Sequence, residues 1–387
     1  MRIAFIHNTF PAGGAERITI DIARYLKSQG GYDVFVYATH RSEALWNDEL
    51  DSILTFRSIP SQAIQRRRSK EVESLVVSDR IDVLVQVTKA LPGIDGIRRR
   101  TGVKSVIACH GEPFWQRYAI TYRRQKGALR RLLWRLYNKR RFADGTLAME
   151  MAIKRTMSDY LSSDAYTVLC EPYKKEVERV LGVEPEMSRI HAIENPEIPV
   201  DDVCWEKDNV ILFCGRFENW SKRIDRLLRI WAGIQDRLPD WKLQLVGSGP
   251  AEGMLRRMAE ELKLERVSFE GRQADVSGYY RKASVVVLTS ETEGWPLALS
   301  EGQAHGCIGV AFGATAGITE ILSPDGECGF IVPPFDEDAF ADTLLKIALM
   351  SDDEKMKVRR NSVAKRKKYH PESIAAKWKV MFDSLDC

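Results

Sequence analysis

Short runs of Val, Ile and Leu alternate along this chain with longer stretches whose apolar residues recur at helical spacing. Uninterrupted apolar strands separated by helices are typical of parallel sheets that are covered on both faces. The first half holds the predicted strands RIAFIH, DVFVYA, DVLVQV, SVIACH and either GTLAM or AYTVLC, and the second half holds NVILFCG, KLQLVGSG, VSFEG, SVVVLTS, IGVAFG and GFIV. The pattern predicts an α/β fold with two doubly wound, Rossmann-like domains facing each other across a cleft.

The length and the charge distribution both indicate two domains. A chain of 387 residues exceeds one ordinary domain, and the Pro- and acid-rich stretch HAIENPEIPV is the predicted linker. We therefore expect domains at 1–196 and 197–370. The first 196 residues carry 32 Lys and Arg against 23 Asp and Glu, whereas the remainder carries 26 against 31. A basic and an acidic half predict different partners.

The apolar runs and the cysteines point to a cytoplasmic protein. The opening run in MRIAFIHNTF is too short for a signal-peptide core, and no window reaches the roughly 18 to 20 apolar residues that span a bilayer. The seven cysteines include no CxxC pair. We therefore expect reduced thiols.

The stretch SETEGWPLALSEGQAHG, which follows a predicted strand, holds three glutamates. Pro296 is expected as the first residue of a helix that has no capping side chain, which leaves the N–H groups of Leu297 and Ala298 available to an anion. Glu293 precedes this helix start and Glu301 lies more than one turn inside it. Two carboxylates so placed suit two groups of hydroxyls on one ligand, with a phosphate between them. The alternative is that both are ordinary partly exposed carboxylates.

The run ETEGWPLALSE resembles the Glu-x7-Glu signature of family-4 glycosyltransferases, which are retaining enzymes of the GT-B fold. Further signatures of that family follow one another in the expected order along almost the whole chain, namely GGAER, HG, IENPEI, CGRFENWSKRIDRLL, LQLVGSGP and IAAKWKVMF. The resemblance implies that Glu301 holds the ribose of a nucleotide and that Glu293 holds the donor sugar. It also implies that the C-terminal helix, 371–387, packs back on the first domain.

Two cations follow the strand NVILFCG. Arg216 and Lys222 can both reach a diphosphate whose charge grows as the glycosidic bond breaks, and the resemblance implies that role for them. Surface charges on a strand–helix loop are the alternative. Arg223 stands where the family usually has Gly, so we expect a tighter loop or an additional cation.

Glycines open several of the predicted helices. FPAGGAERI can bring backbone N–H groups against phosphate or sugar, and the resemblance implies that Gly14 approaches the donor, so Gly13 and Gly14 are candidates. A tight turn alone would also explain this loop. LVGSGPAEG misses the dinucleotide fingerprint spacing and is interpreted as a turn that borders the nucleotide, with Gly249 as a candidate. Arg272 resembles a residue of the turn that cradles the base.

His110 follows the strand SVIAC and precedes a glycine, where a cleft residue is expected. An imidazole there could orient an acceptor hydroxyl or take its proton, whereas a structural histidine is the alternative. No DxD triad and no His/Cys cluster has metal-ligand spacing, so we expect neither a metal nor another cofactor. Retention of anomeric configuration is implied by the resemblance alone.

The segment Arg117 to Arg141 carries ten basic residues, no acid and leucines at helical spacing. Such a helix suits an anionic membrane surface, which would make a lipid-linked or anionic saccharide a plausible acceptor at the cytoplasmic face of the plasma membrane. The alternative is an amphipathic helix packed on its own domain. Arginine runs also bind nucleic acid, but the chain contains no recognisable nucleic-acid module, so we expect no such partner.

These observations predict a retaining glycosyltransferase that moves a sugar from a nucleotide-diphosphate donor, expected to be a UDP-sugar, to a saccharide or lipid-linked saccharide, in the synthesis of bacterial cell-surface polysaccharide or lipopolysaccharide. The alternatives are a GT-B sugar-nucleotide hydrolase or epimerase, and a membrane- or nucleotide-binding protein without transferase activity. Trp295 and Gly302 depart from the family pattern beside the donor sugar. The candidate catalytic residues are His110, Glu293, Arg216 and Lys222, and the candidate donor-binding residues are Gly13, Gly14, Arg216, Lys222, Gly249, Arg272, Glu293, Gly294, Trp295, Pro296, Leu297 and Glu301.

Overall fold

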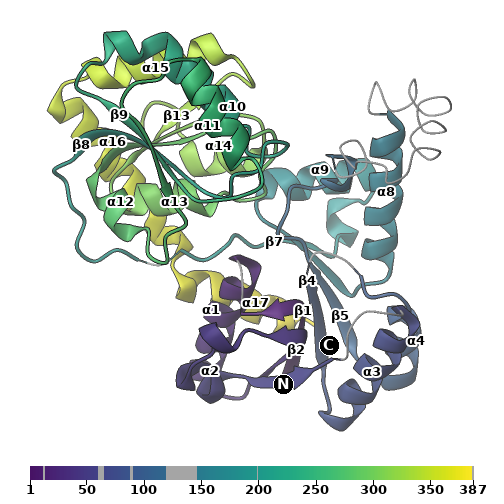
Figure 1. Cartoon of the computed structure of the whole chain (residues 1–387). Coiled ribbons are helices and arrows are strands. Elements are labelled where there is room, and N and C mark those ends of the chain that lie inside the picture. The colour runs from purple at the N-terminus through teal and green to yellow at the C-terminus, as the bar shows by residue number, and fades with distance from the viewer. Residues whose placement is uncertain (12–13, 60–64, 88–89, 119–145, 198, 386–387) are drawn as a thin grey trace. The chain divides into compact units, whose positions relative to one another are not determined.

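The computed structural model describes the chain except for residues 12–13, 60–64, 88–89, 119–145, 198 and 386–387 (Figure 1). The chain divides into two compact units. Unit 1 comprises residues 1–196 and 371–387, and unit 2 comprises residues 197–370. Each unit contains its own parallel sheet.

Unit 1 is built on a seven-stranded sheet with the order β3-β2-β1-β4-β5-β6-β7, in which every pair is parallel. The order reverses between β1 and β4. Its elements are β1 (Arg2–Phe10), α1 (Gly14–Gln29), β2 (Asp33–Arg41), α2 (Asp48–Ile53), β3 (Thr55–Ser58), α3 (Gln65–Ser78), β4 (Val83–Val87), α4 (Ile94–Thr101), β5 (Lys104–Ala108), α8 (Thr146–Leu161), β6 (Ala165–Val168), α9 (Glu171–Leu181), β7 (Ile190–Ala192) and α17 (Pro371–Asp383).

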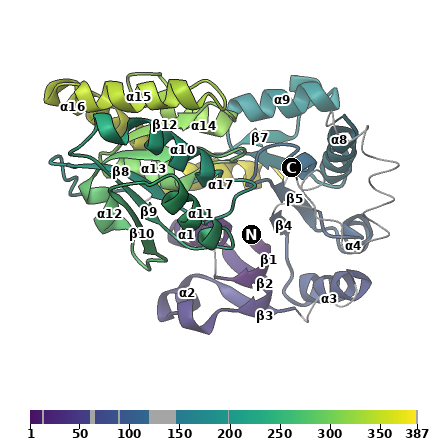
Figure 2. The same cartoon turned by 45° about the horizontal axis from the view of Figure 1, so that its top comes forward.

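The last helix of the chain, α17, packs against the first helix, α1, and the two lie side by side in Figures 1 and 2. Trp378 and Phe382 of α17 are buried, with their rings 5.6 Å apart. The Tyr32 hydroxyl donates to Asp383 Oδ1 over 2.6 Å, and Lys377 Nζ lies 2.5 Å from Glu194 Oε2. Apolar packing and polar contacts therefore join the two ends of the chain within unit 1.

Unit 2 contains a six-stranded parallel sheet with the order β10-β9-β8-β11-β12-β13. The order reverses between β8 and β11. Its elements are β8 (Asp208–Cys214), α10 (Ile224–Ile234), β9 (Lys242–Val246), α11 (Glu252–Glu261), β10 (Val267–Gly271), α12 (Ser277–Lys282), β11 (Ala283–Leu288), α13 (Leu297–Ala304), β12 (Ile308–Phe312), α14 (Ala316–Leu322), β13 (Phe330–Val332), α15 (Glu337–Leu349) and α16 (Asp352–Arg366).

Helices cover both faces of the unit 2 sheet. Figure 1 shows α10, α11 and α15 on one side, and α12 and α13 on the other. Every residue of β11 and β12 is buried, as expected for continuous apolar strands between two helical layers. In α10 the apolar side chains, including Leu227 and Trp231, form the buried face.

The prediction of two parallel, Rossmann-like sheets is confirmed. Of the two alternatives for the last strand of the first half, AYTVLC is confirmed, because AYTV forms β6, whereas the run within GTLAM begins helix α8. Thr146 to Met149 begin a sixteen-residue helix, and a helix start cannot be distinguished from a strand in so short an apolar run. The short edge strands β3 and β7 were not predicted. No helix among the described residues combines the length and the apolar character needed to cross a bilayer.

Candidate functional site

The loops that follow β8 and β11 leave the unit 2 sheet side by side. These strands are neighbours, with Ile211 paired to Val285, and the strand order reverses between them. In open parallel sheets, ligands bind beyond the carboxyl ends of the strands at such a reversal. The loop after β8 spans residues 215–223 and carries Arg216 and Lys222, and the loop after β11 spans residues 289–296 and carries Glu293.

An ion pair joins the two loops. Lys222 Nζ lies 2.6 Å from Glu293 Oε1, and the two side chains are 25% and 10% exposed. The Ser290 hydroxyl donates to the same carboxylate oxygen over 2.6 Å. Because both contacts are partly shielded from water, they hold the ammonium and the carboxylate in a defined geometry. The structure therefore brings together the cation and the acid that the sequence predicted for a diphosphate and a sugar.

Helix α13 begins beside this pair and lacks a side-chain cap. Its first residue is Leu297, and Pro296 occupies the N-cap position with φ −72° and ψ 98°. Pro296 therefore precedes the helix, contrary to the prediction that it would be the first helical residue, because its ψ is extended. Pro296 provides no capping side chain, so this end of α13 suits an anion.

Trp295 is buried before this helix start, with its ring packed edge-on to Tyr369 at 5.1 Å. It can therefore present its backbone to a ligand, while its indole supports the loop from within unit 2. Gly294 lies between Trp295 and Glu293 and is partly exposed.

Glu301 is positioned by a residue that the sequence did not reveal. The Tyr280 hydroxyl of α12 donates to Glu301 Oε2 over 3.4 Å. Burial, followed by the nearby Cys214 and Glu301, raises the pKa of Tyr280 well above its ordinary value, so the phenol keeps its proton and remains a donor. Its ring stacks on His305 at 5.6 Å, and burial lowers the pKa of His305 to about 4. His305 is therefore neutral near pH 7.

The other predicted unit 2 residues lie at the same end of the sheet. Arg216 follows β8 with 65% of its side chain exposed, 3.9 Å from Glu218, and could turn toward a ligand. Gly249 follows β9, where an added Cβ would meet Phe217 O at 2.4 Å, so close backbone packing explains this glycine. Gly247 is tighter, because an added Cβ would lie 1.8 Å from Gly215 O. Arg272 is exposed after β10.

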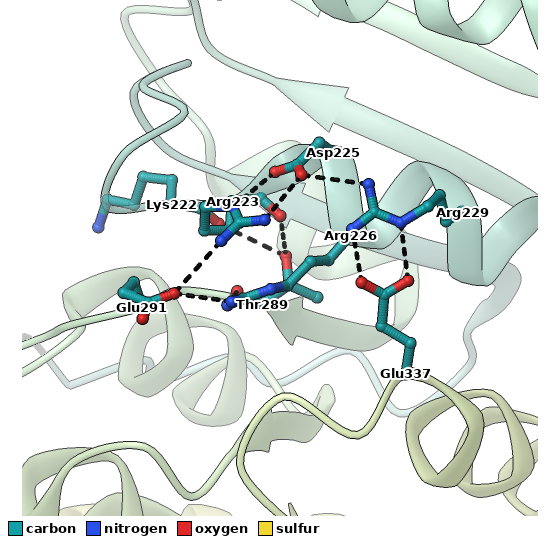
Figure 3. A network of polar contacts seen from close by, with 8 residues as sticks. All are labelled: Lys222, Arg223, Asp225, Arg226, Arg229, Thr289, Glu291 and Glu337. Carbon is teal, nitrogen blue, oxygen red and sulfur yellow. Dashed lines mark hydrogen bonds and ion pairs between the residues drawn. The ribbon is translucent and has the colours of Figure 1, made fainter. Parts of the chain in front are cut away.

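Arg223 does not present an unpaired cation. It begins the turn into α10 with φ 46° and ψ 46°, a left-handed conformation that favours glycine. Its guanidinium donates to both oxygens of Asp225 over 3.0 Å and lies 3.4 Å from Glu291 (Figure 3). The expectation of an additional cation for the ligand is therefore wrong, because two carboxylates already engage this side chain.

Unit 1 carries His110 and Gly14. His110 lies just past β5, where its Nδ1 is 3.2 Å from Asn195 Oδ1. An amide oxygen can only accept, so Nδ1 carries the proton and Nε2 is left as an acceptor. Burial lowers the pKa of His110 to about 4, with the Asn195 contact opposing that shift. Gly14 is the first residue of α1, and Gly13 falls outside the described residues.

A second buried histidine was not anticipated from the sequence. His7 of β1 is 4% exposed, and its Nε2 lies 2.9 Å from Thr19 Oγ1. Its Nδ1 lies 3.5 Å from Glu16 Oε1. Both His7 and Glu16 influence the pKa of His110, so these groups lie near one another within unit 1. The sequence analysis used the apolar run Ile3 to Ile6 only to predict the strand and did not single out His7, which follows that run.

The described residues contain no cluster of three His, Cys, Asp or Glu side chains that could hold a metal ion. A surface hollow of about 470 Å³ lies at the amino ends of β8, β9 and β10, opposite the end that carries the predicted site. Most of the basic segment Arg117 to Arg141 lies outside the described residues.

Two family descriptions match this chain. Glycosyltransferase Family 4 matches residues 12–196, and Glycosyl transferases group 1 matches residues 208–349. The two matches divide near Pro196, where the two compact units also divide.

Known proteins resemble the chain over most of its length. It is 27% identical over 337 residues to an uncharacterized glycosyltransferase of Haemophilus influenzae, covering 84% of each chain. It is 24% identical over 367 residues to a Campylobacter jejuni enzyme, GalNAc-alpha-(1->4)-GalNAc-alpha-(1->3)-diNAcBac-PP-undecaprenol alpha-1,4-N-acetyl-D-galactosaminyltransferase, covering 92% of this chain and 90% of that protein. The crystal structure of Anabaena Alr3699/HepE in complex with UDP and glucose has a TM-score of 0.71 at 16% identity, covering 99% of this chain and 100% of that chain.

Proposed function

This chain belongs to the group 1 and family 4 glycosyltransferases, and on that premise we propose that it moves a sugar from a nucleotide-diphosphate donor to a saccharide or lipid-linked saccharide acceptor. The observation that carries the donor site is the Lys222–Glu293 ion pair at 2.6 Å. It joins the loops at the strand-order reversal of unit 2, beside the uncapped start of α13. Cation, carboxylate and helix N–H groups together suit a diphosphate that carries a sugar.

Each part of the donor has a proposed partner in unit 2. Arg216 and Lys222 bind the diphosphate together with the backbone N–H groups of Leu297 and Ala298 at the start of α13. Glu293 accepts hydrogen bonds from the sugar hydroxyls. Glu301, held by Tyr280, accepts from the ribose hydroxyls. Gly249 and Arg272 border the nucleotide.

Bond cleavage leaves negative charge on the diphosphate and positive charge on the anomeric carbon. Lys222, the helix start and Arg216, once it turns toward the ligand, stabilise the leaving diphosphate because their positive charges and N–H dipoles offset the charge that develops there. We propose no metal ion for this step. We also propose retention of configuration, which the coupling constant of the product's anomeric proton would test; an inverted product would disprove it.

Unit 1 is proposed to bind the acceptor, and Gly14 and His110 are its candidate ligand-binding residues. Because the pKa of His110 is about 4, the ring is neutral near pH 7 and a weak base. Its unprotonated Nε2 therefore accepts a hydrogen bond from a sugar hydroxyl and orients it, which is a more suitable role than full proton abstraction.

The relatives support the choice of substrates. The HepE structure contains UDP and glucose, which favours a UDP-sugar donor. The name of the Campylobacter jejuni relative specifies a saccharide linked through diphosphate to undecaprenol, which favours a lipid-linked saccharide acceptor. We accordingly propose a role in bacterial cell-surface polysaccharide or lipopolysaccharide synthesis, at the cytoplasmic face of the plasma membrane.

A thermal-shift panel of UDP, GDP, ADP and their sugar conjugates tests the donor site. One nucleotide and its conjugate should raise the melting temperature, because a ligand that binds only the folded state stabilises it. The absence of a shift with all of them would contradict the proposal.

Two variants separate the roles of the carboxylates. Glu301→Ala should weaken nucleotide binding by about tenfold, the equivalent of about 1.4 kcal/mol, because a charge-assisted hydrogen bond to ribose is lost. Glu293→Ala should weaken nucleotide binding less than Glu301→Ala does and should mainly reduce transfer, by about 100-fold, as is typical when one transition-state contact is removed. Calorimetric titration with UDP and a transfer assay measure the two effects, and the reverse pattern would contradict the assignment.

A further inference from the structure

Glu291 is the first of the two glutamates in the loop after β11, and the proposed donor site does not use it. Its Oε2 lies 2.7 Å from Arg226 Nη2 and 3.4 Å from Arg223 Nη1 (Figure 3). Its side chain is 17% exposed. Two guanidinium groups of the protein therefore bind this carboxylate. The function of Glu291 then depends on which segments of the chain those contacts join.

The same region is also tied through the backbone. The Glu291 N–H donates to Ser221 O over 2.7 Å, and the Thr289 hydroxyl donates to Arg223 O over 3.0 Å. Ser221 and Arg223 flank Lys222 in the sequence. These contacts therefore fix the backbone on both sides of the lysine to the loop that carries Glu293.

The backbone conformation of Arg223 indicates that the contacts of this region restrain it. A non-glycine residue at φ 46° and ψ 46° is disfavoured, and it persists only where its surroundings hold it. The contacts of its side chain with Asp225 and Glu291 supply that restraint. Glycine would adopt the same backbone without strain, but it would lose the link to Glu291.

The outer part of the network offers a control. Asp225 also lies 3.2 Å from Arg229, whose guanidinium lies 2.5 Å from Glu337 (Figure 3). The side chains of Arg229 and Glu337 are 40% and 30% exposed, and Glu337 belongs to α15. The Arg229–Glu337 pair therefore resembles the Glu291 contacts chemically but does not join the two site loops.

We propose that Glu291 is a positioning residue that, through Arg223 and Arg226, locks the loops after β8 and β11 together and so holds Lys222 and Glu293 in their donor-binding geometry. This inference rests on the proposed function. It assigns to Glu291 no contact with the donor.

The test compares Glu291→Gln with Glu337→Gln in the full-length protein. Glu291→Gln should reduce kcat/KM for the donor by about tenfold or more, since small misplacements of binding groups have large kinetic effects. It should weaken UDP binding in the same direction, while Glu337→Gln should leave both unchanged. Equal behaviour of the two variants, with an active wild type, would overturn the inference and leave the proposed function intact.

Arg223→Gly distinguishes positioning from general stability. It relieves the left-handed strain, so the melting temperature should stay close to that of the wild type, yet UDP binding should weaken because one link is lost.

The loss caused by Glu291→Gln should also shrink in a Lys222→Ala background, because Glu291 acts through the lysine. If Glu291→Gln caused the same loss of UDP binding with and without Lys222→Ala, the inference would be overturned. A wild type that binds none of UDP, GDP and ADP would overturn both this inference and the proposed function.

Discussion

At the scale of single residues, the site depends on groups whose partners lie far away in the sequence. Lys222 and Glu293 were predictable, because each belongs to a short run with a recognisable pattern. Tyr280 and Glu291 were not, because their importance comes from contacts with Glu301 and with Arg223 and Arg226, which only the folded sheet brings near. The lack of a side chain at Gly247 likewise matters only because Gly215 O approaches it.

His110 predicts a pH dependence of stability. The folded pKa of about 4 lies below the ordinary value of 6.5, so the unfolded chain binds more protons between these values. Stability should therefore be retained above pH 6.5 and lost as the pH falls toward 4. Between pH 7 and pH 5 the contribution of this group is about 2 kcal/mol.

Urea denaturation of the wild type and His110→Asn at pH 7 and pH 5 measures this effect. The wild type should lose about 2 kcal/mol more than the variant on acidification, because asparagine has no proton to bind. Equal losses in the two proteins would show that burial does not hold this imidazole neutral. The comparison also cancels the contribution of other titrating groups, including His305.

At the scale of elements, the start of α13 is supported by a buried ion pair. Arg366, the last residue of α16, lies 3.0 Å from Glu197, with side chains 5% and 4% exposed. The Glu197 N–H donates to Tyr369 O over 2.8 Å, and Tyr369 packs on Trp295. Burial raises the pKa of Glu197, and Arg366 opposes that shift. Residues near the two ends of unit 2 thus meet beneath the loop that carries Trp295.

Arg366→Met should destabilise the protein by about 3 to 5 kcal/mol, because it leaves the Glu197 carboxylate buried without its partner. The double variant Glu197→Gln/Arg366→Met should recover much of that loss, since no buried charge remains. Chemical denaturation of the wild type and the two variants measures both quantities. A double variant no more stable than the single one would show that the lost stability comes from packing, not from the unpaired charge.

At the scale of the whole molecule, the parallel sheets could be predicted because buried strands are short, apolar and regularly spaced. The edge strands β3 and β7 could not, since they are three or four residues long and carry little periodic signal. The sequence left GTLAM and AYTVLC as alternatives for a similar reason, because a short apolar run such as the first turn of α8 fits both periodicities. The family match covers both units, which the ordered motifs anticipated.

The basic run from Arg117 to Arg141 predicts that the whole molecule binds anionic membranes. Ten basic residues without an acid should attract an anionic membrane surface. We expect cosedimentation with vesicles containing anionic phospholipid, decreasing as salt rises from 50 to 500 mM because salt screens the attraction. Neutral phosphatidylcholine vesicles are the control. Equal binding to both vesicle types, or binding to neither, would contradict a membrane role for this segment.

A crystal structure of the protein grown with UDP tests the central claim most directly. We predict the diphosphate within hydrogen-bonding distance of Arg216, Lys222 and the first turn of α13, with the ribose hydroxyls on Glu301. UDP bound elsewhere on the chain, or bound with these side chains turned away from it, would contradict the account.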